Sequence, residues 1–353
     1  MARTPERRVR TLDFAQFCHG EPSSSHGFCR ELVDCLRSLG FVKIRNHGIS
    51  GEEIEKVFVM NKLFFSLPQA AKAKAAHPPE ANPHRGYSYV GQEKLSRVKD
   101  YEKGKRSIVD VYDIKESYDQ GPAVDKLYPN RWPDKQDIPG FRVVMEKFYE
   151  RCHQVHQDVL RAIATGFDLS PSFLTDLCCE NTSELRLNHY PGVHPSSLRK
   201  GAKRISEHTD FGTVTLLFQD SVGGLEIEDQ NSPGTYFPVS SERKSDMIVN
   251  VGDCIQRWTN DKILSTSHRV VLPEDRDALI KDRYSVAYFG KPSRSQLVSP
   301  LREFVKEGEK PKYSAISAWQ YNQEKLVLTY GGDEEILVPK PSSSVCTGVG
   351  QLQ

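Results

Sequence analysis

The spacing of hydrophobic residues divides the chain into a helical first part and a strand-rich second part. Within residues 26–76, apolar residues recur at intervals of three and four, the period of an amphipathic helix, and the stretch 41–44 between them alternates like a strand. The clearest helix is predicted over 139–167, where one apolar stripe runs along the whole segment. Residues 184–289 then change to short apolar runs separated by turn residues, which indicates many strands.

Many short strands with regular turns predict a double-sheet barrel. We therefore expect a mainly β protein with flanking helices: a double-stranded β-helix, or cupin-like jelly roll, with a helical N-terminal region and a long bracing helix. The segment 77–135 is rich in Pro, Gly, Tyr and charge and predicts a long irregular connection, of a kind that is often functional. A helical pattern returns around 314–323, and the polar tail 340–353 is expected to be disordered.

These changes of pattern define four expected regions in a chain of 353 residues. Residues 1–135 form an N-terminal region of helices plus the irregular segment, and 136–180 form the bracing helix. Residues 181–295 form the jelly-roll core, and 296–353 form a C-terminal helix and the tail. The length suits one large domain or two small ones.

Composition and charge narrow the class of function. With 48 basic and 47 acidic residues the formal net charge is +1, so no net field favours nucleic acid or an anionic membrane. The chain shows no apolar run long enough to span a bilayer and no secretory signal at its start. Its eight cysteines include no CxxC pair, which favours a reduced chain. We expect a cytoplasmic enzyme with a small-molecule substrate and no nucleic-acid or membrane partner; its oligomeric state is open.

Three residues have the chemistry of an iron(II) site. His208 and Asp210 are alternate residues just before a buried strand, so both side chains can point to one side, and His268 follows in a later strand-like run. Two imidazoles and one carboxylate cover one face of an octahedron and leave positions for a cosubstrate, water and oxygen. Each residue alone is more often a surface or core residue; only the combination favours metal ligation.

A cation and a hydroxyl follow, two positions apart. Arg283 and Ser285 share one face of a strand rich in apolar residues, and such a pair suits the distal carboxylate of a small dicarboxylic acid. A surface ion pair is the alternative for Arg283, but a buried arginine needs an anionic partner. Together with the iron ligands, the pair predicts an oxygenase that uses iron and 2-oxoglutarate.

Ordered motifs along most of the chain give a resemblance to a known family. The chain resembles the isopenicillin N synthase-like family of 2-oxoglutarate- and iron(II)-dependent dioxygenases. The matching segments follow in the family's order at 40–49, 185–191, 207–210, 223–226, 250–253, 267–270 and 283–289. A further likeness, to a fungal-type subgroup with thymine hydroxylase and aromatic-polyketide oxygenases, lies at 85–88, 113–118 and 130–133.

The resemblance implies the jelly-roll fold and a role for individual residues. Fe(II) should be held by His208, Asp210 and His268. The residues that should hold 2-oxoglutarate are Arg283 at the distal carboxylate, with Ser285, Tyr190 and Asn188. The oxidant would be O2, and ascorbate is expected to stimulate turnover.

The substrate is less well defined than the cosubstrate. Arg186 lies two residues before Asn188 on the same strand face and could bind a carbonyl, phenolate or carboxylate. Phe211 and Phe289 could clamp a flat ring, although both are equally well explained as core residues. We expect C–H or methyl hydroxylation of a small planar ring compound, in secondary metabolism or nucleobase oxidation. Thymine-oxidising members of the subgroup carry an apolar residue where this chain has Asn188, which disfavours thymine itself.

Other classes of function stay open. An oxidase of the isopenicillin N synthase type takes all four electrons from its substrate and needs no 2-oxoglutarate; the intact Tyr190, Arg283 and Ser285 favour the cosubstrate-dependent enzyme. Desaturation and oxidative ring expansion are alternative outcomes to hydroxylation. A metal-free binding protein on an oxygenase scaffold is disfavoured by the complete set of ligands, although the fold alone would not exclude it.

Overall fold

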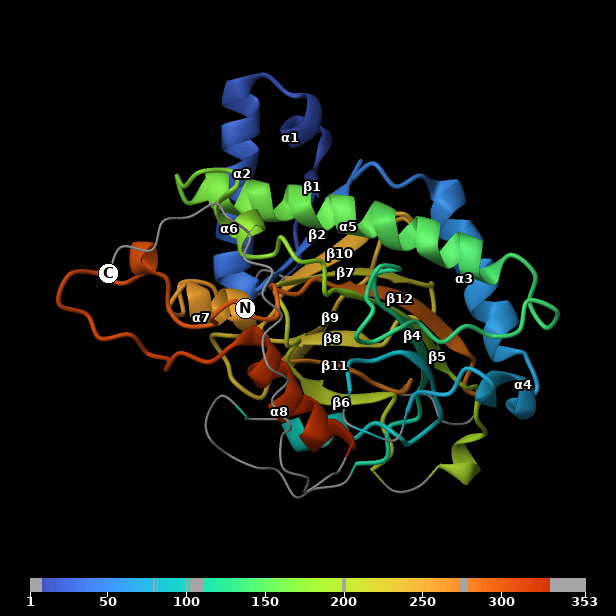
Figure 1. Cartoon of the computed structure of the whole chain (residues 1–353). Helices are drawn as coiled ribbons and strands as arrows, with labels where there is room; N and C mark the ends of the chain where they lie inside the picture. The colour runs from blue at the N-terminus through green and yellow to red at the C-terminus, as the bar shows by residue number, and fades with distance from the viewer. Residues whose placement is uncertain are drawn as a thin grey trace, which may run out of the picture.

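The strands form two sheets in the computed structural model, which describes residues 8–78, 80, 82–98, 101, 111–198, 201–273 and 279–330. The large sheet contains, in spatial order, β1 (Thr11–Asp13), β2 (Phe41–Arg45), β10 (Met247–Val251), β7 (Val214–Gln219), β12 (Arg283–Phe289), β5 (Glu184–Tyr190), β4 (Glu116–Gln120) and β3 (Gly86–Ser88). The small sheet contains β6 (Ile205–His208), β11 (His268–Val270), β8 (Leu225–Glu228) and β9 (Tyr236–Pro238). Figure 1 shows the small sheet stacked against the large one.

The predicted double-stranded β-helix is confirmed by the order in which the chain visits the two sheets. From β5 to β12 the chain alternates, with β5, β7, β10 and β12 in the large sheet and β6, β8, β9 and β11 in the small one. Neighbouring strands in this part pair antiparallel. This alternation encloses a space between the sheets, as a jelly roll does.

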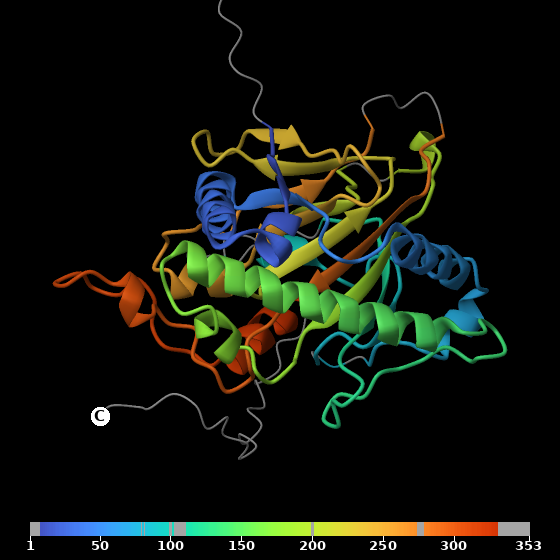
Figure 2. The same cartoon turned by 90° about the horizontal axis from the view of Figure 1, so that it is seen from above.

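Helices α2 (Pro22–Leu39), α3 (Gly51–Phe65) and α5 (Phe141–Gly166) lie on the outer side of the large sheet (Figure 1). The predicted helix over 139–167 is α5, which packs against α2, α3 and the sheet. Figure 2 shows α5 running across the molecule above the strands. α3 begins with a reciprocal capping box in which the Ser50 hydroxyl accepts from Glu53 N–H and the Glu53 carboxylate accepts from Ser50 N–H. The other helices are α1 (Ala15–His19), α4 (Gln69–Ala73), α6 (Phe173–Asp176), α7 (Asp253–Trp258) and α8 (Ala318–Tyr330).

Side-chain alternation gives the large sheet two different faces. On β12, Val286 and Tyr288 join the apolar core beneath the helices. The alternate residues of the same strand point between the sheets and line a cavity: Arg283, Ser285, Ala287 and Phe289. The outer face therefore stabilises the fold through apolar burial, while the inner face is free to carry polar chemistry.

The segment 77–135 is more regular than the sequence predicted. It contains β3 and β4, which extend the large sheet beyond β5, and a short 3-10 helix, η1 (Leu95–Val98), beside β6. Buried residues of β4 such as Ser117 and Asp119 are polar, so hydrophobic alternation could not reveal the strand. The N-terminal region thus shares its sheet with the jelly roll.

The structure has a C-terminal helix near the place where the sequence predicts one. The helical pattern around 314–323 corresponds to α8, and the tail 340–353 lies outside the described residues. Among the described residues, no helix is both long and apolar enough to cross a membrane.

Free thiols are found at Cys18, Cys29, Cys35, Cys152, Cys178 and Cys254. Cys179 is disulfide-bonded, which differs from the fully reduced chain expected.

Candidate metal and cosubstrate site

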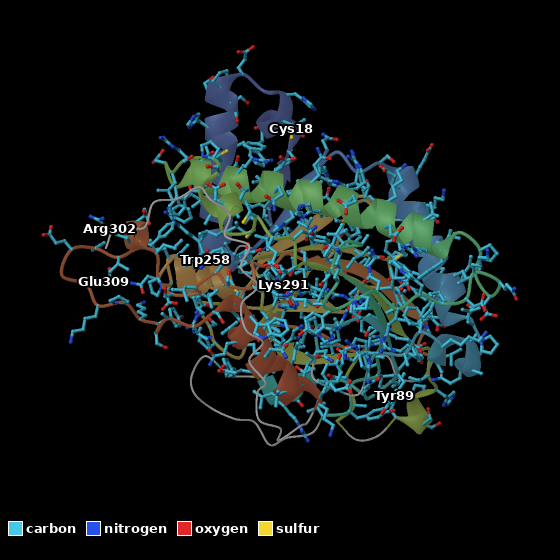
Figure 3. The ribbon with its side chains drawn as sticks, in the orientation of Figure 1. Cys18, Tyr89, Trp258, Lys291, Arg302 and Glu309 are labelled. Atoms are coloured by element: carbon cyan, nitrogen blue, oxygen red, sulfur yellow. The ribbon has the colours of Figure 1, made fainter. Side chains whose placement is uncertain are left out.

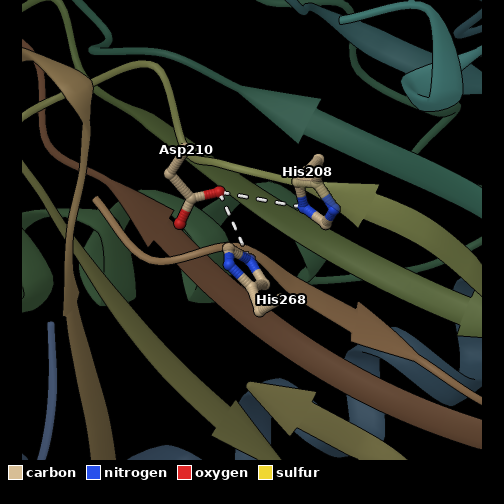
Figure 4. Close-up of side chains that lie close together, drawn as sticks. All are labelled: His208, Asp210 and His268. Atoms are coloured by element: carbon tan, nitrogen blue, oxygen red, sulfur yellow. Dashed lines mark ion pairs between the residues drawn. The ribbon is translucent and has the colours of Figure 1, made fainter. Parts of the chain in front are cut away.

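Two neighbouring strands of the small sheet, β6 and β11, and the loop after β6 bring the three expected metal ligands together. His208 ends β6 and His268 begins β11, and the two are antiparallel partners with ring centroids 4.3 Å apart. Asp210 follows β6, and its Oδ1 lies 4.0 Å from Nε2 of His208 and 3.7 Å from Nε2 of His268 (Figure 4). The donor atoms all lie within 4.8 Å of one another. One small cation between them would contact all three.

Backbone carbonyls fix the orientation of both imidazoles. The Nδ1 atom of His208 donates to the Ser206 carbonyl at 2.8 Å, and Nδ1 of His268 donates to the Thr266 carbonyl at 3.1 Å. Because a carbonyl can only accept, each Nδ1 carries the proton and each Nε2 keeps its lone pair. A metal-binding histidine is usually held in this way by its second nitrogen.

Two side chains orient the Asp210 carboxylate. Its Oδ2 accepts from Thr215 Oγ1 at 2.6 Å and from Asn250 Nδ2 at 2.7 Å, which leaves Oδ1 for a metal. Burial alone would raise the pKa of Asp210, but the nearby imidazoles and these hydrogen bonds lower it. Burial, with His268 acting in the same direction, lowers the pKa of His208 to about 4. The site therefore favours a carboxylate and a neutral imidazole, the forms that bind a metal.

The loop that carries Asp210 is also held by the C-terminal part of the chain. The Asp253 N–H donates to the Asp210 carbonyl at 2.8 Å. The Asp253 carboxylate accepts from the Thr209 hydroxyl at 3.2 Å, from the Tyr321 hydroxyl at 3.0 Å and from the ammonium of Lys325. Tyr321 and Lys325 belong to α8, so one buried carboxylate joins this helix to the metal loop.

The residues expected from the sequence line two adjoining cavities. The first is lined by His208, Asp210, His268, Tyr190, Asn188, Arg186, Arg283, Ser285 and Phe289. Phe211 lines the second, which shares His208, Asp210, Arg186 and Phe289 with the first. The structure thus places all ten residues around one site, although their individual roles stay predictions.

Arg283 has the surroundings of a carboxylate-binding residue. The side chain is buried in the middle of the large sheet, where Nε donates to the Gly223 carbonyl and Nη2 to Gln219 Oε1, each at 2.8 Å. Its Nη1 is buried and has no hydrogen-bond partner among the described residues. The guanidinium lies 4.8 Å from the centre of the Tyr190 ring. An unpaired buried N–H is costly, which favours an anionic ligand there. Gln219, a polar residue at the end of an apolar strand, was not among the residues expected from the sequence.

Asn188 and Ser285 leave further polar capacity beside Arg283. They are partners in the β5/β12 ladder, where Asn188 Nδ2 donates to Ser285 Oγ at 3.3 Å. Asn188 Oδ1 is buried without a partner in the described part of the chain. The Ser285 hydroxyl accepts this bond, so its own O–H can still donate. The cavity lined by the metal ligands therefore also contains a buried cation and a hydroxyl, the groups that the sequence analysis expects at the far carboxylate of 2-oxoglutarate.

Arg186 lines the cavity as expected, but its charge is already neutralised. It donates to both Glu93 oxygens at 2.9 Å, and to Asp119 through Nε at 2.7 Å and Nη2 at 3.1 Å. Lys115 adds a second cation to Glu93 at 2.6 Å. These ion pairs fix the guanidinium within the protein, and nothing in the sequence indicated them. Direct contact between Arg186 and the substrate stays a prediction. The guanidinium lies over the Phe289 ring, 5.8 Å from its centre, so both residues line the same part of the cavity.

Replacing Arg186 by alanine is expected to lower the free energy of unfolding by about 3–5 kcal/mol, because two buried carboxylates would lose their shared cation. Urea unfolding would measure the change. An Arg142→Ala variant is the control, since its exposed pair with Glu146 contributes little. If Arg186→Ala keeps its stability and loses only substrate-dependent succinate release, the residue acts on the substrate as first expected.

Comparison with known proteins agrees with this geometry. Residues 9–135 match the family model described as non-haem dioxygenase in morphine synthesis N-terminal, and residues 181–292 match that of the 2OG-Fe(II) oxygenase superfamily. The chain is 87% identical over 340 residues to the 2-oxoglutarate-Fe(II) type oxidoreductase ppzD of Metarhizium majus, covering 94% of this chain and 97% of that protein. It is 51% identical over 324 residues to the proline hydroxylase buaE of Petromyces alliaceus, covering 91% and 99%. The thymine hydroxylase of Neurospora crassa, crystallised with alpha-KG and thymine, superposes with a TM-score of 0.80 at 33% identity, covering 92% and 98%.

Proposed function

This chain belongs to the 2-oxoglutarate- and Fe(II)-dependent oxygenase superfamily, and we propose that it hydroxylates a C–H or methyl group of a small ring compound. One observation supports the proposal most: the three metal donors and the unpaired Nη1 of Arg283 face the same cavity. Enzymes of this superfamily use Fe(II) as cofactor and 2-oxoglutarate and O2 as cosubstrates. The bound iron would supply the chemistry that oxidises an unreactive C–H bond.

The residues of the chain position the reactants and keep water out. Arg283 and Ser285 would hold the distal carboxylate of 2-oxoglutarate, so that its 2-oxo acid end points toward His208, Asp210 and His268. Apolar side chains that line the same cavity would exclude water from the reacting centre: Leu217, Leu225 and Val270. No side chain is required as a general base, since the substrate loses a hydrogen and not a proton.

A small planar ring is one candidate substrate. The likeness to the Neurospora thymine hydroxylase, whose structure contains thymine, supports it, and Phe211 and Phe289 line the cavity next to the metal ligands. Aromatic side chains at this cavity suit the face of a flat ring. Nucleobase oxidation would then be the physiological context.

A saturated ring that carries an amino and a carboxylate group is the second candidate. The relative named as a proline hydroxylase supports it. A separate observation is the charge at the cavity next to the metal ligands, where Glu184 and Lys291 place both signs side by side. Such a substrate would place the enzyme in secondary metabolism.

Purified enzyme with Fe(II), O2 and 2-oxoglutarate should release succinate in step with the oxidation of an added ring compound. We would assay succinate and product together, with a chelator-treated sample as the control. Hydroxylation adds one oxygen atom to the product, whereas desaturation removes two hydrogens. Product formed without consumption of 2-oxoglutarate would instead support the substrate-only oxidase.

A further inference from the structure

The Glu184–Lys291 ion pair lies at the opposite end of the β5/β12 ladder from the proposed cosubstrate site. Arg283 pairs with Tyr190 in this ladder, and Phe289 pairs with Glu184. Arg283 and Phe289 are six positions apart along the strand, which is roughly 20 Å. One molecule of 2-oxoglutarate cannot span that length, so Glu184 and Lys291 are not cosubstrate residues. They share a cavity with His208 and Asp210 that Arg283 and Ser285 do not line.

Lys291 keeps hydrogen-bond donors that the protein does not use. The Lys291 side chain is 12% exposed, and its ammonium donates to Glu184 Oε2 at 2.6 Å, the one acceptor it has among the described residues. An ammonium has three N–H groups, so two stay available. The side chain is half-buried and lines two neighbouring cavities: one contains metal ligands, and the other is lined by Trp319 and Asn322 of α8.

The cavity beside α8 contains a second donor that has no acceptor among the described residues. Trp319 is 8% exposed, and its Nε1 is buried with no hydrogen-bond partner in the part of the chain described. Its ring is stacked on Tyr128 with centroids 5.3 Å apart, which holds the indole in place. An indole nitrogen can only donate. Unused donors from Lys291 and Trp319 thus line one cavity, and a ligand with acceptor oxygens would satisfy them.

The other charged groups around these cavities are already paired. Glu184 accepts from Arg85 at 3.1 Å as well as from Lys291. Arg85 also contacts Asp125, which in turn contacts Arg294, which contacts Glu180. This network therefore alternates three cations with three anions. Arg186 and Lys115 balance Glu93 and Asp119 in the same way. A ligand with net charge would leave an uncompensated buried charge, so the cavity favours a ligand of zero net charge.

We propose that Lys291 and Glu184 are the specificity-determining residues of the substrate site, and that they bind the carboxylate and the amino group of a zwitterionic ring amino acid. Lys291 donates to the substrate carboxylate, and Glu184 accepts from the substrate ammonium. The four charges then alternate, as they do in the network behind them. This inference rests on the proposed function and selects the second of its two candidate substrates.

The test compares substrates that differ in one charged group. L-Proline and L-pipecolic acid carry both groups, L-prolinamide lacks the carboxylate, and thymine has neither. We would measure binding by anaerobic calorimetry with Fe(II) and 2-oxoglutarate present, and turnover by succinate release. The wild-type enzyme should bind L-proline more tightly than L-prolinamide. Lys291→Gln should weaken the binding of L-proline by about tenfold to a hundredfold, which is the effect of losing a hydrogen bond to a charged group. The same variant should bind L-prolinamide and 2-oxoglutarate as the wild type does.

Two further variants separate binding from folding. Lys291→Arg keeps the cation and should recover part of the L-proline affinity. Lys312→Gln removes an exposed lysine that pairs with Asp261 and should change nothing. If Lys291→Gln fails to fold, the wild-type preference for L-proline over L-prolinamide still tests whether the site requires the substrate carboxylate, and Lys291→Arg tests the role of the side chain.

The outcomes distinguish failure of this inference from failure of the proposed function. Succinate release with thymine but with neither amino acid would overturn the inference and leave the proposed function standing. An unchanged preference for L-proline over L-prolinamide in Lys291→Gln would also overturn it. No iron-dependent succinate release with any ring compound would mean that the proposed function itself fails.

Discussion

A His268→Ala variant is expected to lose turnover completely and to lose most of its iron. The imidazole supplies one of three protein donors, and its Nε2 lies 3.7 Å from Asp210 Oδ1 in the cluster that would hold the metal. Two donors form a much weaker chelate than three, and this residue is buried, so solvent cannot easily replace it. Iron per chain after anaerobic reconstitution and succinate release would be measured on the same sample.

His194→Ala provides the matched control for this result. His194 is exposed and forms its contacts with Ser196 in the same short turn, outside the strands that carry the ligands. It should keep the wild-type iron content and rate. Full activity in His268→Ala, with iron bound, would show that the metal is held elsewhere.

An Arg283→Ala variant is expected to raise the Michaelis constant for 2-oxoglutarate strongly while leaving iron binding intact. Removing one partner of a buried, hydrogen-bonded charge pair costs about 2–5 kcal/mol. Arg283→Lys should recover only part of this loss, because a point charge cannot replace the planar fork of a guanidinium. The constant would be measured at saturating substrate, with iron content as the second readout.

Arg302→Ala serves as the control for the loss of an arginine, since this side chain is exposed and stands at the edge of the molecule (Figure 3). Its Michaelis constant should not change. If Arg283→Ala also shows no change, the enzyme does not use Arg283 for 2-oxoglutarate, and the substrate-only oxidase becomes the better interpretation.

The sequence could predict those parts of the fold that depend on local apolar spacing. The helix over 139–167 is predictable because its stripe is continuous, and the strands in 184–289 because each is short, apolar and followed by a turn. Strands β3 and β4 were missed because their buried residues are polar and are satisfied by side chains far away in the sequence. Ser117, for example, donates to Glu93.

The site shows the same division between local and distant information. Residues two positions apart on a strand share a face, so the pairs His208 with Asp210 and Arg283 with Ser285 could be placed from spacing alone. The charge state of Arg186 could not, because its partners Glu93 and Asp119 come from a segment with no recognisable periodicity. Lys291 lies two residues past Phe289 and continues the side-chain alternation of β12. Its ion pair with Glu184 could not be predicted, because the two residues are far apart in the sequence.

The contacts of the Asp253 carboxylate join parts of the chain that are synthesised at different times. Synthesis proceeds from the N-terminus, so His208, Asp210 and His268 all leave the ribosome before Lys325 of α8 does. A nascent chain therefore possesses every metal donor while the loop beneath Asp210 still lacks the cation that ties it down. The loop that carries Asp210 therefore gains these contacts only when α8 docks, after every metal donor has already been synthesised.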